Sequence, residues 1–426
     1  MNPIIAADAQ YALELCARIA AITDVPGTIT RLFLSPATHQ VHALLREEME
    51  SLGMTVRLDS IGNLRGLYPT QIPQAPVLLV GSHIDTVPDA GPYDGILGIA
   101  APLALLRALK GRRLPYAIEV IAFSEEEGIR FKQPFLGSRA LTGNLSCTEL
   151  ARKDSEGISI AQAIRNFGLN PDSLADCAPT PNTFAFLELH IEQGPVLESL
   201  DLPIGIVSTI VGQSRFDFTF HGQANHAGTT PMNLRRDALV AAAEFICSVE
   251  RYAGNHPSLI ATVGTIHAKP GASNIIPGTV TLSLDIRHSE NTTRVLAAES
   301  LRALAELAGA HRNVHLTAHL TSQHFSVAMD PTLRNMLADA AQAAGYAAHV
   351  MPSGAGHDAM IATQRIEPGP LPAAMLFLRT PGGLSHHPDE SVSAADVQAA
   401  LETCFHFVEQ LDVAAFNPDP SGELQP

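Results

Sequence analysis

The chain has 426 residues, 46% of them hydrophobic and 16% charged, and its 43 acidic against 27 basic residues give a formal net charge of -16. This length predicts two domains. The acidic balance argues against binding to nucleic acid or to anionic membranes, and no apolar run reaches the roughly 20 residues that span a bilayer.

The first residues, MNPIIAADAQYALELCARIA, contain Asp8 and Glu14 and lack the basic start of a signal peptide. They predict an amphipathic helix and a cytoplasmic location. Five widely spaced cysteines without a C-x-x-C pair argue against a disulfide framework and against a thiolate zinc site.

Strands and helices alternate from the start, which predicts an α/β fold with a mixed, mostly parallel sheet. We expect a first set of helices at 8–22, 38–53 and 96–111, and strands at 54–58, 63–68, 76–82, 116–123 and 184–191. A second set follows: strand 214–221, helix 234–252, strands 260–267 and 279–287, helix 292–310 and strand 313–320.

The βαββαβ order of the second set predicts a ferredoxin-like domain at 213–324. It is inserted into a catalytic domain made of residues 1–212 and 325–426, because α/β alternation resumes afterwards and ends with a helix at about 394–412.

Ionisable residues follow the apolar strands, where open α/β sheets bind their ligands. GSHIDTVPDAGPYDG carries His83, Asp85 and Asp94, and YAIEVIAFSEEEG ends in the glutamates 125–127. A polar turn and a solvated charge run are the structural alternatives for these two clusters. Asp85 is too near His83 in the chain to be an obvious ligand, and is expected to hold the other ring nitrogen of His83.

Two more clusters follow apolar strands. His190 lies in LELHIEQGPVLE, and His386 and His387 lie in GGLSHHPDES after AAMLFLR. Imidazole and carboxylate together suit divalent metals, and an aspartate can bridge two ions. The sequence shows no phosphate loop, no H-E-x-x-H and no G-x-S-x-G. The clusters together therefore predict a two-metal hydrolase in which a free carboxylate takes a proton from water.

The motifs GSHIDTV, YDG, EEEG, ELHIEQGPVLE, NHAGTTPM, SGAGHDAM and SHHPDES occur in this order over almost the whole chain. They resemble the dinuclear metal-dependent amidases of the hydantoinase/carbamoylase family, which includes N-carbamoyl-L-amino-acid hydrolases, allantoate amidohydrolases and β-ureidopropionases. The resemblance implies two divalent ions per subunit, zinc or manganese. Their implied ligands are His83, Asp94, Glu126, His190 and His386, with Asp94 bridging the ions.

The resemblance also implies roles for the remaining motif residues. Glu125 would be the general base and Glu127 would have no role. His387 is the alternative ligand to His386. The inserted domain would be a lid and a dimerisation module of a homodimer, and the residues expected to bind a small-molecule substrate are Gln193, His226, Asn274, Arg287 and Gly356.

Within this set, His226 would stabilise the oxyanion, in the family often from the partner subunit, and Asn274 and Arg287 would hold the substrate carboxylate. Gln193 and Gly356 would contact the ureido or carboxylate end.

The expected reaction is hydrolysis of the carbamoyl (ureido) C–N bond of a small carboxylate substrate, of the N-carbamoyl-L-amino acid hydrolase type, with release of ammonia and carbon dioxide. Allantoate amidohydrolase is the alternative, since YDGILGI and LGSRALTG resemble its patterns. A deacylase or metallopeptidase is less favoured because His190 stands where those enzymes usually carry a carboxylate. A binding protein without catalysis is disfavoured because Glu125 has no evident structural role.

Overall fold

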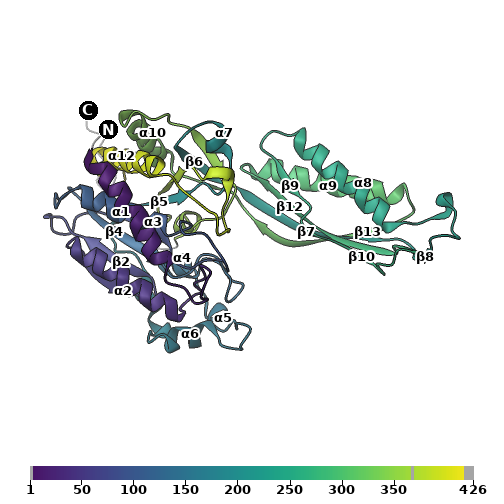
Figure 1. Ribbon diagram of the computed structural model, residues 1–426, viewed down its shortest axis with the longest axis horizontal. Helices are drawn as coiled ribbons and strands as arrows, with labels where there is room; N and C mark the ends of the chain where they lie inside the picture. The colour runs from purple at the N-terminus through teal and green to yellow at the C-terminus, as the bar shows by residue number, and fades with distance from the viewer. Residues whose placement is uncertain (1–2, 366–368, 417–426) are drawn as a thin grey trace. The chain divides into compact units, whose positions relative to one another are not determined.

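The computed structural model describes residues 3–365 and 369–416. The chain forms two compact units, Met1–Ser208 with Met329–Pro426 and Thr209–Ala328 (Figure 1). The boundaries lie at 208/209 and 328/329, where we expected 212/213 and 324/325. Among the described residues, no helix has both the length and the hydropathy needed to cross a membrane.

The larger unit contains a mixed sheet with the strand order β1-β2-β4-β3-β5-β16-β6, and β15 also pairs with β6. The four central neighbours β4, β3, β5 and β16 are parallel, whereas β1, β2 and β6 pair antiparallel with their neighbours. This confirms the predicted mixed α/β architecture. The strands are β1 (Thr55–Leu58), β2 (Leu64–Tyr68), β3 (Val77–His83), β4 (Ala117–Phe123), β5 (Thr183–Ile191), β6 (Ile204–Ile210), β15 (Val350–Ser353) and β16 (Ala373–Leu378).

Every residue of the four parallel strands is buried, as expected for strands that are covered on both faces. Helix α1 packs against α3 and α12, and α10 packs against α12. Helix α3 also contacts β3 and β5. The helices of this unit are α1 (Pro3–Ala20), α2 (Pro36–Ser51), α3 (Leu97–Ala108), α4 (Leu136–Leu141), α5 (Cys147–Leu150), α6 (Ile160–Asn166), α7 (Val196–Ser199), α10 (Pro331–Ala343), α11 (Asp358–Ala362) and α12 (Ala394–Gln410), with short 3-10 turns η1 (Pro171–Cys177), η3 (Pro381–Gly383) and η4 (Val413–Phe416).

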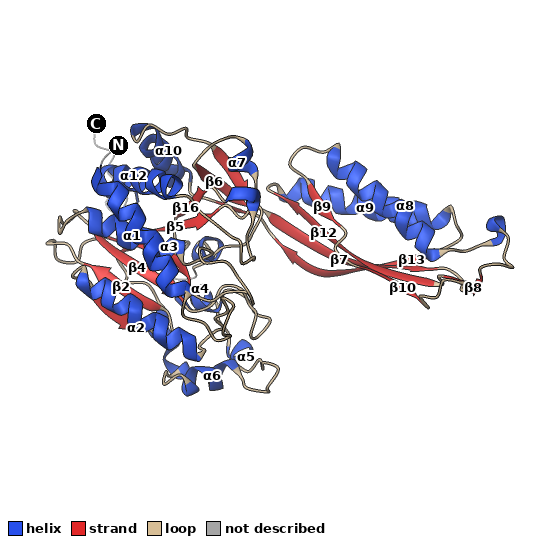
Figure 2. Cartoon of the chain, in the orientation of Figure 1, coloured by secondary structure: helices blue, strands red, loops and turns tan. Residues whose placement is uncertain are grey.

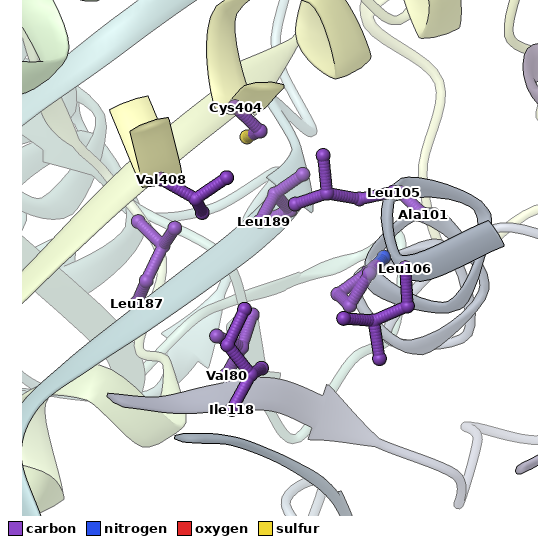
Figure 3. A pocket seen from close by; sticks show the side chains of 10 residues that line it. Val80, Ala101, Leu105, Leu106, Ile118, Leu187, Leu189, Cys404 and Val408 are labelled. Carbon is purple, nitrogen blue, oxygen red and sulfur yellow. The ribbon is translucent and has the colours of Figure 1, made fainter. Parts of the chain in front are cut away.

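A small cavity lies in the core between α3, α12 and the sheet (Figure 3). Side chains from both helices and from strands β3, β4 and β5 line it, and all are apolar except the thiol of Cys404. Polar groups that could orient a ligand are absent from this lining, so the cavity is a packing gap and not a binding site.

A buried ion pair joins two strands at the edge of this sheet. Arg65 of β2 donates through Nε and Nη2 to the two carboxylate oxygens of Glu119 of β4, at 2.9 and 2.8 Å. Its Nη1 donates to the carbonyl oxygen of Cys177 in η1 at 2.7 Å. The fork geometry satisfies both charges in a region closed to water.

We expect Glu119→Gln to lower the free energy of unfolding by about 3–5 kcal/mol, because it leaves the Arg65 guanidinium buried without a counter-charge. Urea denaturation measures the change. The double variant Arg65→Met with Glu119→Leu, which removes both charges, should cost less than the single change. A loss below about 1 kcal/mol for Glu119→Gln would contradict this account of the pair.

The smaller unit is an antiparallel sheet with two helices along one face (Figure 2). Its strand order is β10-β12-β7-β13, β9 also pairs with β12, and its core lies between the sheet and helices α8 and α9. Two short strands, β8 and β11, form a separate pair. The elements are β7 (Gly212–His221), β8 (Asn225–His226), α8 (Ala238–Gly254), β9 (Ile260–Thr262), β10 (Ile266–Lys269), β11 (Ile275–Ile276), β12 (Thr279–His288), α9 (Asn291–Ala310), β13 (His315–His324) and β14 (Val327–Ala328), with the 3-10 turn η2 (Met232–Leu234).

One predicted strand of this unit, 260–267, is interrupted. The structure divides it into β9 and β10, and both pair with β12. At the interruption, the backbone N–H of Thr265 donates to the hydroxyl of Ser283 at 3.0 Å instead of to the backbone of β12. The element order is therefore β-α-β-β-β-α-β when the small pair β8 and β11 and the terminal β14 are left aside.

Candidate metal centre

The predicted ligand clusters lie at one edge of the larger sheet, because the four strands that carry them are parallel neighbours. His83 is the last residue of β3 and lies opposite Phe123 of β4, the strand that precedes the three glutamates. His190 of β5 lies opposite Phe377 of β16, the strand that precedes His386. Carboxyl ends of adjacent parallel strands place these side chains beside each other.

Asp94 lies at the centre of these side chains. Its Oδ1 is 3.2 Å from Nε2 of His190 and 3.6 Å from Nε2 of His83. Its Oδ2 is 3.0 Å from Nε2 of His386. One carboxylate thus faces two imidazoles with one oxygen and a third imidazole with the other.

Among the described residues, two groups of donor atoms share Asp94. The first group is His83, Asp94 and His190, and the second group is Asp94, Glu127 and His386. Within each group, one donor atom from every residue lies within 4.8 Å of the others. In the second group, Oε1 of Glu127 is 3.4 Å from Nε2 of His386. Three N and O donors per group, with a shared carboxylate, match what zinc or manganese accepts at paired sites.

The protein alone leaves this centre unsatisfied. Asp94 is buried, and its Oδ1 accepts no hydrogen bond from any described residue. Burial, and then the negative charge of Asp94, raise the pKa of Glu127 to about 7. A buried acceptor without a donor and a carboxylate disfavoured in its charged form are both stabilised by a cation, so the residues present fit divalent metal ions.

Backbone carbonyl groups fix the two buried imidazoles. Nδ1 of His83 is 3.0 Å from the carbonyl oxygen of Asp85, and Nδ1 of His190 is 2.9 Å from that of Ile191. A carbonyl only accepts, so each Nδ1 carries the proton and each Nε2 presents its lone pair. The lone pairs lie on the side of Asp94, which is the tautomer that a metal ligand requires.

Asp85 lies beside His83, as expected, and also holds the glutamate run. Its Oδ1 and Oδ2 accept the backbone N–H groups of Glu126 and Glu127 at 2.9 and 3.1 Å. Its Oδ1 is 3.4 Å from Nδ1 of His83, and its backbone oxygen makes the closer contact described above. Asp85 therefore joins the His83 loop to the glutamate run.

The three glutamates lie in three different environments. Glu125 is fully buried, its Oε2 accepts the backbone N–H of Leu136 at 3.2 Å, and it belongs to neither group. Glu126 is half-buried and clusters with His83 and Glu127. The structure thus places Glu127, for which no role was predicted, in the second group. It places the predicted base, Glu125, outside both.

Between the two adjacent histidines of the last cluster, His386 lies at Asp94. His387 instead accepts the backbone N–H of Asp389 through Nδ1 at 3.1 Å and is exposed.

Gln193 has a contact that was not predicted. Its Nε2 donates to Oδ2 of Asp94 at 3.2 Å and to the Ser385 hydroxyl at 3.1 Å.

His357, in SGAGHDAM, has no predicted role but lies against the centre. Its ring centroid is 4.5 Å from that of His190, and its Nε2 is 2.9 Å from the Ser353 hydroxyl. It also groups with His190 and Glu188, but both Glu188 oxygens already accept hydrogen bonds from the protein, from Ser82 Oγ and Ala359 N. Glu188 and His357 are therefore a hydrogen-bonded support for His190 and not part of another metal site. The neighbouring Gly356, a predicted substrate contact, is exposed.

Three predicted substrate residues lie in the smaller unit, in two separate places. His226 of β8 is paired with Ile275, and the carbonyl of Asn274 accepts the backbone N–H of Ala227 at 2.9 Å, so His226 and Asn274 are close together. Arg287 lies near the far end of β12, where its Nε and Nη2 donate to Asp285.

The strand register separates these two places. Thr279 of β12 lies opposite His221, close to β8, whereas Arg287 lies opposite Gln213. Eight residues of extended chain span about 27 Å. Within one chain, His226 and Arg287 therefore cannot contact the same small molecule.

Residues 79–410 match the family described as Peptidase family M20/M25/M40. An N-carbamoyl-L-amino acid amidohydrolase of Geobacillus stearothermophilus is 38% identical over 389 residues, which cover 90% of this chain and 94% of that protein. An allantoate deiminase of Arabidopsis thaliana is 36% identical over 425 residues, which cover 92% and 80%. The crystal structure of an amidase of the hydantoinase/carbamoylase family from Burkholderia multivorans superposes with a TM-score of 0.87 at 30% identity, over 94% of this chain and 97% of that one.

Proposed function

The chain belongs to Peptidase family M20/M25/M40, and on that premise we propose that it is a metal-dependent amidohydrolase that cleaves the carbamoyl C–N bond of an N-carbamoyl-L-amino acid. The observation that carries this proposal is Asp94, whose two oxygens face two different ligand groups. The relatives named above are a carbamoyl-amino acid amidohydrolase and an allantoate deiminase, so a ureido group on a small carboxylate is the shared substrate class.

Two divalent ions, zinc or manganese, would be held by the first and second groups, with Asp94 between them. When bound, such ions polarise a carbonyl group and lower the pKa of a water molecule. The ligand set differs from the predicted one at a single position, since Glu127 takes the place of Glu126. The reason is geometric: Glu127 lies 3.4 Å from His386, and both residues share a group with Asp94.

Glu126 is then the residue free to act as general base. It lies beside His83 and Glu127 without belonging to either proposed ligand group, and it is half-buried, whereas Glu125 is closed in the core. Its backbone N–H is held by Asp85. Glu126 takes a proton from the attacking water and passes it to the departing nitrogen. Water adds its oxygen to the ureido carbon and the C–N bond breaks, which gives ammonia and a carbamate that decomposes to carbon dioxide and the amino acid.

Gln193 and His190 favour a ureido substrate over a peptide. Gln193 presents its amide beside Oδ2 of Asp94, where it can bond the terminal nitrogen or oxygen of a carbamoyl group. The first group contains one carboxylate, Asp94, because His190 contributes an imidazole. Peptidases of this superfamily usually have a carboxylate at that position as well, which gives them two. Allantoate, which carries two ureido groups, is the second candidate substrate because of the allantoate deiminase relatives.

We further propose a homodimer in which the smaller unit is a ferredoxin-like lid and dimerisation domain. His226 with Asn274 lies near one end of β12 and Arg287 near the other, about 27 Å away. In this proposal all three bind substrate, so the two sets serve different active sites and one set acts in the partner subunit. Helices α8 and α9 of this unit also expose large apolar side chains, as a self-association surface requires. These side chains are Leu239, Val240, Val295, Leu296 and Leu307.

Ammonia release from manganese- or zinc-loaded protein tests the proposal. N-carbamoyl-L-methionine, N-carbamoyl-β-alanine, allantoate and N-acetyl-L-methionine are given in parallel. We expect turnover of the carbamoyl amino acids and none of the acetyl compound. Turnover of allantoate alone would assign the second candidate function, and silence on every ureido compound would refute the carbamoyl assignment.

A further inference from the structure

We propose that Glu390 is a positioning residue that joins the loop of Asp94 to the loop of His386 and so sets the spacing of the second ligand group. This inference rests on the proposed metal centre. Glu390 lies in GGLSHHPDES, four residues after His386, and its side chain has no role in the mechanism above.

The carboxylate of Glu390 accepts three hydrogen bonds. Its Oε1 accepts the backbone N–H groups of Tyr93 and Asp94 at 2.8 and 3.0 Å. Its Oε2 accepts the hydroxyl of Ser385, the residue before His386, at 3.2 Å. Glu390 is 4% exposed, so these bonds form away from water. One buried side chain therefore binds both loops that carry proposed metal ligands, and these loops are almost 300 residues apart in the chain.

The second group needs such a connection and the first does not. His83 and His190 lie on the central strands β3 and β5, and their side chains are almost fully buried. The side chain of His386 is 47% exposed. His386 also has a φ of 55°, in the left-handed region that a non-glycine residue adopts only when its surroundings hold it there. Burial cannot hold His386 in place, so its loop depends on hydrogen bonds.

Neighbouring residues support this connection. A Cβ atom at Gly91 would lie 2.3 Å from Cβ of Glu390 and 2.5 Å from its Oε1. Only glycine therefore lets the Asp94 loop approach the carboxylate. Gln193 also bonds the side chains of Asp94 and Ser385, but it belongs to neither loop. Glu390, in contrast, belongs to the His386 loop and bonds the backbone of the Asp94 loop.

Competition with a chromophoric zinc chelator, without substrate, tests the inference. We expect two zinc ions to bind with different affinities. Glu390→Ala should lower the affinity of the more weakly bound ion by about 10- to 100-fold, the usual effect of removing a support of a metal ligand. Glu390→Gln should lower this affinity by less than tenfold, because the amide oxygen of glutamine still accepts the Tyr93 and Asp94 N–H groups. Gly91→Ala, which leaves every charge in place, should reproduce most of the Glu390→Ala effect. Excess zinc should restore full zinc occupancy in Glu390→Ala, which a folding defect would not allow.

Asp59→Asn is the matched control. Asp59 is a buried carboxylate that also accepts two backbone N–H groups and one side-chain donor, but its loop carries no metal-ligand candidate. We expect this variant to lose thermal stability and to keep wild-type zinc affinity. Wild-type zinc affinity in folded Glu390→Ala, or an equal loss in Asp59→Asn, would overturn the inference. Because the assay contains no substrate, failure of the wild-type protein to hydrolyse ureido compounds would count against the proposed function alone.

Discussion

Replacing Glu126 with glutamine is expected to lower kcat by about 10²- to 10⁴-fold, the contribution of a positioned general base, while both metal ions remain bound. Glutamine keeps the size of the side chain but cannot take a proton. The backbone bond from residue 126 to Asp85 and the second ligand group do not depend on the lost charge. Ammonia release gives kcat, and metal analysis of the same sample gives the ion content.

Glu125→Gln is the control that separates this assignment from the one predicted from sequence. Burial, and then the charge of Asp85, raise the pKa of Glu125 well above its ordinary value, so a neutral amide resembles the form already favoured there. We expect this variant to keep kcat within about tenfold. Loss of activity in Glu125→Gln with an active Glu126→Gln would return the base role to Glu125.

Asp94→Asn is expected to lower kcat by at least about 10³-fold and to lower the affinity of the protein for both metal ions. Polarisation of a carbonyl by metal is worth several kcal/mol, and each 1.4 kcal/mol is a factor of ten in rate. The substitution removes the one negative charge that both ligand groups share. Zinc affinity by chelator competition and kcat by ammonia release measure the two effects.

Asp89→Asn, an exposed aspartate on the same loop, is the matched control for Asp94→Asn. Its backbone has a φ of 55°, which asparagine tolerates. This variant should keep the metal content and activity of the wild type. An Asp94→Asn protein that loses only one ion would contradict a bridging role.

The strands and the location of the centre could be predicted because they depend on local patterns. Apolar runs such as those of β3 and β5 are visible in the sequence, and the end-of-strand rule brings His83 and His190 to one edge. The structure confirms these strands and places both histidines beside Asp94.

The different environments of the three adjacent glutamates could not be predicted from the sequence EEE alone. What separates them is the turn after β4, where Asp85, some forty residues earlier in the chain, accepts two consecutive backbone N–H groups. That turn leaves Glu125 in the core and brings Glu127 to His386. A contact so distant in sequence leaves no local signal, and the same is true of Glu390 and the Asp94 loop.

The strand register of the smaller unit could also not be predicted from motifs. NHAGTTPM and LDIRH each indicate a functional turn or strand end. Only the strand pairing shows that Arg287 lies at the end of β12 opposite to the end near His226 of β8. The interruption between β9 and β10 has a similar origin, because the hydroxyl of Ser283 competes for a backbone donor.

The most direct test of the paired metal centre is a titration of metal-free protein with Mn²⁺ while ammonia release from N-carbamoyl-L-methionine is followed. We expect no release without metal and a rate that stops rising at about two equivalents per chain, since two groups share Asp94. Full activity in the metal-free protein, or a plateau at one equivalent, would contradict it.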